Sequence, residues 1–169
     1  NKNNNQQNTN TEIVLVESPQ VKNLGVGEGT WPTMRDTLRQ IGISETQFLS
    51  CCDASFKQAS KFVGWRTDSS HYYHPFTTPA GYGTLNMAEH WTQSEEDTDF
   101  ETFVCAQGDI CEQNLAPKTV NMRDYAFNLN YGYHLNAGKF VDLLHQHCVD
   151  KLGVKYVSAH INNVVNDKS

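Results

Sequence analysis

The sequence lacks the long features that mark several classes of protein. No apolar run approaches the ~20 residues that a bilayer-spanning helix needs, and no segment has the pattern of a signal peptide. No basic run occurs either, and 13 Lys and Arg against 19 Asp and Glu give a net charge of −6. We therefore expect neither nucleic acid nor a membrane among the partners of this protein.

The five cysteines include no C-x-x-C pair. They are Cys51, Cys52, Cys105, Cys111 and Cys148, an odd number. This usage predicts reduced thiols in a cytoplasmic protein, and it leaves open a single bridge between Cys105 and Cys111.

The histidines lack the spacing of a metal site. His71 and His74 lie within "HYYHPF" without a third ligand at a suitable distance in the sequence. His145 and His147 are two residues apart in a predicted helix, so they point in different directions. We expect no metal site.

The patterns that are present indicate one α/β unit with an incomplete sheet. The chain does not begin with Met, and we interpret the Asn-rich residues 1–11 as a polar tail or a truncated start. The run "EIVLVES", residues 12–18, predicts a buried parallel strand. Further strands are predicted over 61–67, 69–77 and 154–165. Helices are predicted over 32–41, 44–53, 84–91, 97–107 and 134–152.

Three segments contain residue types that could bind a ligand or react. "GVGEGT", residues 25–30, follows the first strand and favours either close approach of the backbone to a ligand or a tight loop, but it is not G-x-G-x-x-G. The aromatic residues of "HYYHPF" could form a platform for a flat ligand or pack in the core. Glu17 ends the strand, where Rossmann-type folds place an acid against a ribose.

Two lysines lie four residues apart in "DASFKQASKFVGWRT", residues 53–67. A lysine in a dry pocket has a lowered pKa and can act as a nucleophile, whereas a lysine that extends its ammonium into water only covers apolar surface. Periodicity does not separate Lys57 from Lys61, because both would face the same side of one strand.

Five segments in order resemble the flavin-dependent tryptophan halogenases. They are "GVGEGTWP", "ASFKQASKFVGW", "HYYHPF", "YGYHLNAGKFVDLL" and "KLGVKYVSAHINNV". The resemblance extends from Glu12 to Asn166 and corresponds to the early-middle part of such an enzyme, after its G-x-G-x-x-G. It implies that residues 12–169 form a partial FAD-binding domain of the flavin-monooxygenase-like, Rossmann type, with part of the substrate-binding region.

The resemblance also implies a reaction. A separate flavin reductase supplies reduced FAD, oxygen converts it to a flavin hydroperoxide, and halide then yields hypohalous acid. A lysine directs the halogen to an electron-rich aromatic substrate such as tryptophan, and Lys57 matches that lysine whereas Lys61 does not. His74 and Phe76 match residues that line the indole site.

The cofactor contacts implied by the resemblance are distributed over three segments. They are Glu17, Ser18, Gly25, Val26, Gly27, Glu28, Gly29 and Ile161. The chain lacks the family's nucleotide fingerprint, its W-x-W-x-I-P motif, its halide site and the glutamate that assists the lysine. We therefore expect this chain alone to be inactive. An aromatic hydroxylase that uses FAD and a non-catalytic aromatic-binding module stay open as alternatives, as do a pyrrole, a phenol or a larger indole as substrate.

Overall fold

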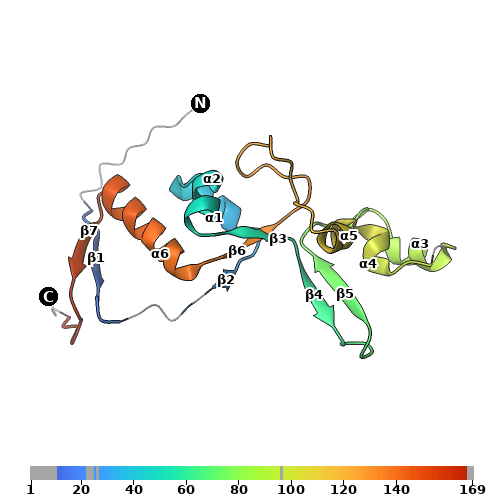
Figure 1. Ribbon diagram of the computed structural model, residues 1–169, viewed down its shortest axis with the longest axis horizontal. Helices are drawn as coiled ribbons and strands as arrows, with labels where there is room; N and C mark the ends of the chain where they lie inside the picture. Colours follow the sequence, from blue (N-terminus) through green and yellow to red (C-terminus); the bar gives the residue numbers. More distant parts are fainter. Residues whose placement is uncertain (1–10, 22–24, 26, 96, 167–169) are drawn as a thin grey trace.

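The computed structural model describes residues 11–166 apart from 22–24, 26 and 96 (Figure 1). The described strands are β1 (Val14–Glu17), β2 (Glu28–Gly29), β3 (Ser55–Lys57), β4 (Ala59–Val63), β5 (His71–Pro75), β6 (Gly132–Leu135) and β7 (Lys155–Ser158). The helices are α1 (Met34–Ile41), α2 (Glu45–Cys51), α3 (Met87–Gln93), α4 (Phe100–Val104), α5 (Gln107–Glu112) and α6 (Ala137–Gln146), which continues into a π-helical turn, His147–Lys151. The α/β class is confirmed.

The strands form three small sheets that lie in a row along the molecule (Figure 1). Parallel β1 and β7 lie at one end beside α6. The antiparallel sheet β2-β6-β3 lies in the middle with α1 and α2. The β4-β5 hairpin lies beyond it, with α4 and α5 beside the base of the hairpin and α3 farther out. Lys57 ends β3, so it lies where the central sheet meets the hairpin.

The first strand is parallel, as its apolar run predicts, but it is not buried. β1 pairs with β7 in the register Val14↔Lys155 to Glu17↔Ser158. Val14 and Leu15 are 49% and 40% exposed. A buried parallel strand needs partners along both edges and layers on both faces. In the described part of the chain β1 is paired along one edge, and this explains why the predicted burial is wrong.

The segment that carries the two lysines is divided between two strands. β3 ends at Lys57 and pairs with β6, whereas Lys61 lies in β4, which pairs with β5. Gln58 separates the strands. The expectation that both lysines face the same side of one strand is therefore wrong, because the chain leaves the central sheet between them.

Several helix boundaries follow from capping residues. Gly42 ends α1 in the left-handed region, at φ 82°, and the Ser44 hydroxyl accepts a hydrogen bond from the Gln47 N–H at 3.1 Å. Asn136 caps α6 in the same way, through the N–H of Lys139. Residues 134 and 135 consequently belong to β6, and the prediction of a helix from 134 is wrong at its start.

The core lies between the central sheet and helices α1, α2 and α6. Its buried members are Leu38, Ile43, Phe48, Cys52, Tyr125, Tyr131, Tyr133, Leu135 and Leu143. The five cysteines are all free thiols. Among the described residues, no helix is both long enough and apolar enough to cross a membrane.

Candidate functional site

Two glycines create the space around Lys57. A β-carbon on Gly132, which is opposite Lys57 in the sheet, would lie 2.4 Å from the Thr30 carbonyl oxygen. The chain that leaves β2 can therefore cross close over β6. A β-carbon on Gly29 would lie 3.4 Å from both the Lys57 Nζ and the His134 Nδ1. The Lys57 and His134 nitrogens thus lie close to the backbone of Gly29, where no side chain intervenes.

The ammonium of Lys57 lies against two aromatic rings. Its Nζ is 5.4 Å from the centroid of the Trp31 ring and 5.3 Å from that of Phe76. The two rings are 5.5 Å apart. A cation held over aromatic faces at such distances gains about 0.5–1 kcal/mol per ring at exposed sites. No carboxylate in the described part of the chain lies within ion-pair distance of this ammonium, so its N–H groups are available to a ligand.

Lys61 has a different environment. Its Nζ lies 2.5 Å from Glu112 Oε1 on α5, and the Tyr73 hydroxyl donates to the same oxygen at 2.7 Å. The hydrogen bond with Glu112 raises the pKa of Lys61 and holds the pKa of Glu112 at about 2. Lys61 therefore ties the hairpin to α5, and the geometry distinguishes it from Lys57 where periodicity does not.

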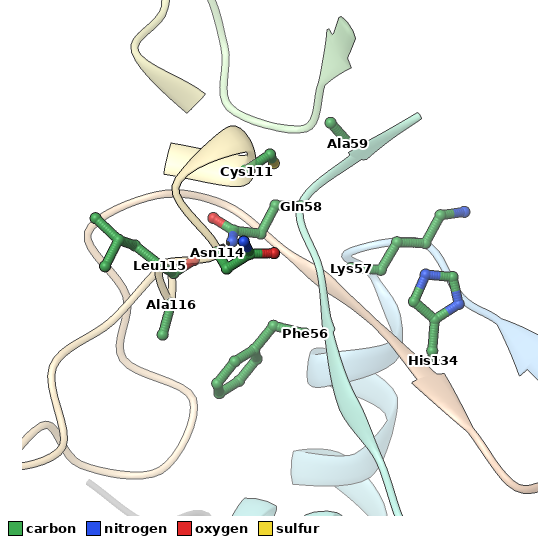
Figure 2. Close-up of a pocket in the computed structure, with 9 residues that line it drawn as sticks. All are labelled: Phe56, Lys57, Gln58, Ala59, Cys111, Asn114, Leu115, Ala116 and His134. Carbon is green, nitrogen blue, oxygen red and sulfur yellow. Dashed lines mark hydrogen bonds between the residues drawn. The ribbon is translucent and has the colours of Figure 1, made fainter. Parts of the chain in front are cut away.

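A pocket of about 400 Å³ adjoins β3, but the Lys57 amine does not point into it. Figure 2 shows Phe56, Gln58 and Leu115 on one side of the strand, and the side chains of Lys57 and His134 on the other. This follows from the alternation of side chains along a strand. The site with the unpaired lysine is the surface beside Gly29, Trp31 and Phe76.

The two residues expected to line the aromatic site are placed differently. Phe76 directly follows β5 and reaches Lys57. His74 lies opposite Ser60 in the hairpin, and its side chain is exposed. It also lines a smaller pocket of about 230 Å³ together with Phe100 and Val104. The structure thus brings Phe76 to the lysine and leaves the role of His74 a prediction.

The residues expected at the cofactor fall into two groups. Glu17 ends β1 and Ser18 follows it, Ile161 comes after β7, and the Ser18 hydroxyl lies 3.3 Å from His160 Nδ1. Gly29, by contrast, lies beside Lys57. The second group comprises Gly25, Gly27, Glu28 and Gly29, and Val26 lies outside the described residues. Of the expected cofactor contacts, Glu17, Ser18 and Ile161 thus lie at the parallel strands, and Gly29 lies at the lysine.

Sequence reasoning missed two residues at this site. Trp31 immediately precedes the predicted helix 32–41 and is assigned no ligand role from the sequence, although its ring lies against Lys57. His134 was placed in a helix, although it lies in β6. A signal for each was present: Trp31 directly follows the glycine loop, and Asn136 is a capping residue that separates His134 from the helix.

Replacing Gly132 by alanine tests the close approach beside Lys57. The new β-carbon would overlap the Thr30 carbonyl, and Thr30 is held to Tyr133 by hydrogen bonds of 2.8 and 2.9 Å. We expect Gly132→Ala to lower the free energy of unfolding in urea by about 1–3 kcal/mol, the usual cost of overpacking. Gly138→Ala is the matched control, because the nearest atom to its β-carbon is 3.4 Å away. Equal stability of the two variants would contradict this reading of Gly132.

The fold and site define an α/β protein that holds a lysine against two aromatic rings beside a glycine loop. A family model described as tryptophan halogenase matches residues 3–169. Tryptophan 6-halogenase ThaL of Streptomyces albogriseolus is 30% identical, over 96% of this chain and 33% of the relative. The chain belongs to the tryptophan halogenase family, which confirms the resemblance seen in the sequence.

Solved structures of high similarity agree with this assignment. A tryptophan halogenase from Shewanella frigidimarina is 44% identical with a TM-score of 0.84, over 93% of this chain and 31% of that chain. Xcc4156, a flavin-dependent halogenase from Xanthomonas campestris, is 28% identical with a TM-score of 0.74, over the same shares. The chain spans about a third of the length of the relatives that it matches.

Proposed function

We propose that the full-length protein attaches chlorine or bromine to an electron-rich aromatic molecule, with tryptophan as the first candidate, and that Lys57 directs the halogen. The observation that carries this proposal is the Lys57 ammonium, which lies against the rings of both Trp31 and Phe76 and is free of a carboxylate partner in the described residues. The relative ThaL, named as a tryptophan 6-halogenase, supports tryptophan as the substrate.

The lysine can direct the halogen in one of two ways. An N–H of Lys57 donates to the oxygen of hypohalous acid, a ring carbon of the substrate forms a bond to the halogen, the oxygen–halogen bond breaks, and the oxygen leaves as water with a proton from the lysine. Alternatively, the neutral amine takes up the halogen and releases water, and the ring then attacks the halogen as the nitrogen–halogen bond breaks. In both cases the ring proton passes to the lysine nitrogen, which restores the lysine, and the flat faces of Trp31 and Phe76 orient the substrate ring.

The residues present fit one part of an FAD site. Parallel β1 and β7 end at the same edge, and ligands of open α/β sheets bind outside the carboxyl ends of such strands. Glu17, Ser18 and Ile161 lie at this edge, and Gly29 lies beside Lys57. FAD would supply the oxidation of halide by molecular oxygen, after reduction by a separate flavin reductase.

The mass of the product tests this proposal. The full-length protein is incubated with tryptophan, FAD, a flavin reductase with its reductant, oxygen and either chloride or bromide. We expect a product in which halogen replaces hydrogen, with the isotope pattern of the halide supplied. A product that has gained one oxygen would instead identify an aromatic hydroxylase. Binding of tryptophan without any product would identify a non-catalytic module.

A further inference from the structure

The short segment that carries Phe76 is held by hydrogen bonds on every side. The Phe76 N–H donates to the Gln58 carbonyl at 3.0 Å, and the Phe76 carbonyl accepts from Asn130 Nδ2 at 2.9 Å. The Thr77 N–H donates to Gln107 Oε1 at 2.9 Å, and its hydroxyl accepts from the Asn130 N–H at 2.8 Å. The backbone at Phe76 therefore has little freedom to move.

Asn130 connects this segment to the core. Its side-chain oxygen accepts from Arg35 Nη2, and its carbonyl accepts from Gln107 Nε2 at 2.7 Å. Arg35 is only 7% exposed, and its guanidinium lies over the rings of Phe127 and Tyr131, at 4.0 and 4.5 Å. The side-chain amide of Asn130 thus links the buried guanidinium of Arg35 on one side to the carbonyl of Phe76 on the other.

This arrangement fixes the distance between Phe76 and Lys57. The ring follows the end of β5, beyond the paired residues of the hairpin, so strand pairing alone does not hold it. A displacement of about 1 Å between reacting groups can reduce a rate by roughly 10²-fold. We propose that Asn130 is a positioning residue, which holds Phe76 against Lys57 and so determines which carbon of the substrate ring faces the lysine. This inference rests on the proposed halogenation.

Asn130→Asp is the variant that tests this role. The substitution keeps the size of the side chain and an oxygen that accepts from Arg35, and the new charge is compensated by the guanidinium. The second oxygen would replace the Nδ2 donor and face the Phe76 carbonyl, where two acceptors repel. Asn128→Asp is the matched control, since it makes the same change at an exposed position of the same segment.

The readouts are the ratio of ring-position isomers, the kcat and KM of the full-length protein, and its release of hypohalous acid without substrate. For Asn130→Asp we expect a several-fold rise in minor isomers and a kcat/KM lower by about 10–100-fold. Hypohalous acid release should not change, and Asn128→Asp should match the unaltered protein. A purely structural role would lower all activities together and leave the isomer ratio as it was.

Failure of the inference can be distinguished from failure of the proposed function. If the unaltered protein halogenates and Asn130→Asp gives the same isomer ratio and kcat/KM, only the positioning role fails. If the unaltered protein forms no halogenated product, the proposed function fails as well. Should Asn130→Asp not fold, Thr77→Val decides the matter, because it removes the hydroxyl acceptor of the Asn130 N–H and keeps the shape of the side chain. An unchanged isomer ratio in that variant would count against the role.

Discussion

We expect Lys57→Ala to abolish the proposed halogenation in the full-length protein, while oxidation of the reduced flavin and release of hypohalous acid continue. The halogenation rate should fall to the background rate. A positioned proton donor or acceptor contributes roughly 10²–10⁴-fold, so we expect a loss of at least that order. The reason is the position of the ammonium, which is 5.3 Å from the Phe76 ring and has no carboxylate partner among the described residues. Product yield and hypohalous acid are measured in parallel on the same samples.

Lys61→Ala is the matched control for this prediction. Lys61 has the same side chain and lies four residues away, but its ammonium is bound to Glu112 on α5. Its loss should loosen the contact between the hairpin and α5 and leave most of the halogenation in place. Full product yield from Lys57→Ala would remove Lys57 from the mechanism, and equal losses in both variants would point to a general effect on folding.

The comparison of these lysines shows how far the sequence determines the site. The ordered motifs favour Lys57 through the family resemblance, whereas residue alternation does not separate the lysines, because it assumes one continuous strand through residues 57–61. The chain instead leaves the central sheet at Gln58, whose carbonyl binds the N–H of Phe76. That change of partner depends on residues from distant segments, so local pattern does not reveal it.

Features set by neighbouring residues are predicted better than those set by distant ones. The Ser44 cap and the Gly42 terminus are correct, since each depends on contacts within one turn. The cap at Asn136 is equally local, but the helix prediction does not use it. The predicted helix therefore begins at 134 and wrongly includes His134. The Asn130 contacts join positions up to 95 residues apart, and no motif links them. The same holds for Glu45, whose hydrogen-bond partners lie 73 to 88 positions away in the sequence.

Glu45 is a buried carboxylate that accepts four hydrogen bonds. Oε2 accepts from Lys118 Nζ at 2.6 Å and from the Tyr125 N–H at 2.8 Å. Oε1 accepts from the Tyr133 hydroxyl at 2.7 Å and from that of Tyr131. Burial by itself raises the pKa of Glu45, but these donors outweigh it and the pKa lies below the ordinary value of 4.5. The carboxylate is therefore ionised and holds α2 to the central sheet.

Removal of Glu45 should be the most destabilising change in this part of the chain. Glu45→Ala leaves the nearly buried ammonium of Lys118 and the hydroxyls of Tyr131 and Tyr133 without their acceptor. Loss of one partner of a buried ion pair costs about 3–5 kcal/mol, and we expect a decrease of that size in the free energy of unfolding in urea. Glu112→Gln is the control, because it removes an exposed ion-paired carboxylate and should change stability little.

The pH dependence of stability separates the charge of Glu45 from its shape. Because its pKa is lower in the folded state, its ionisation stabilises the fold above the ordinary value of 4.5. That stabilisation disappears as the pH falls through the folded pKa. Glu45→Gln keeps the shape and an acceptor for the tyrosines but lacks this ionisation. The difference in unfolding free energy between the unaltered protein and Glu45→Gln should thus be large at pH 7 and shrink on acidification below pH 4.5. A difference that stays constant with pH would show that packing, and not charge, makes Glu45 important.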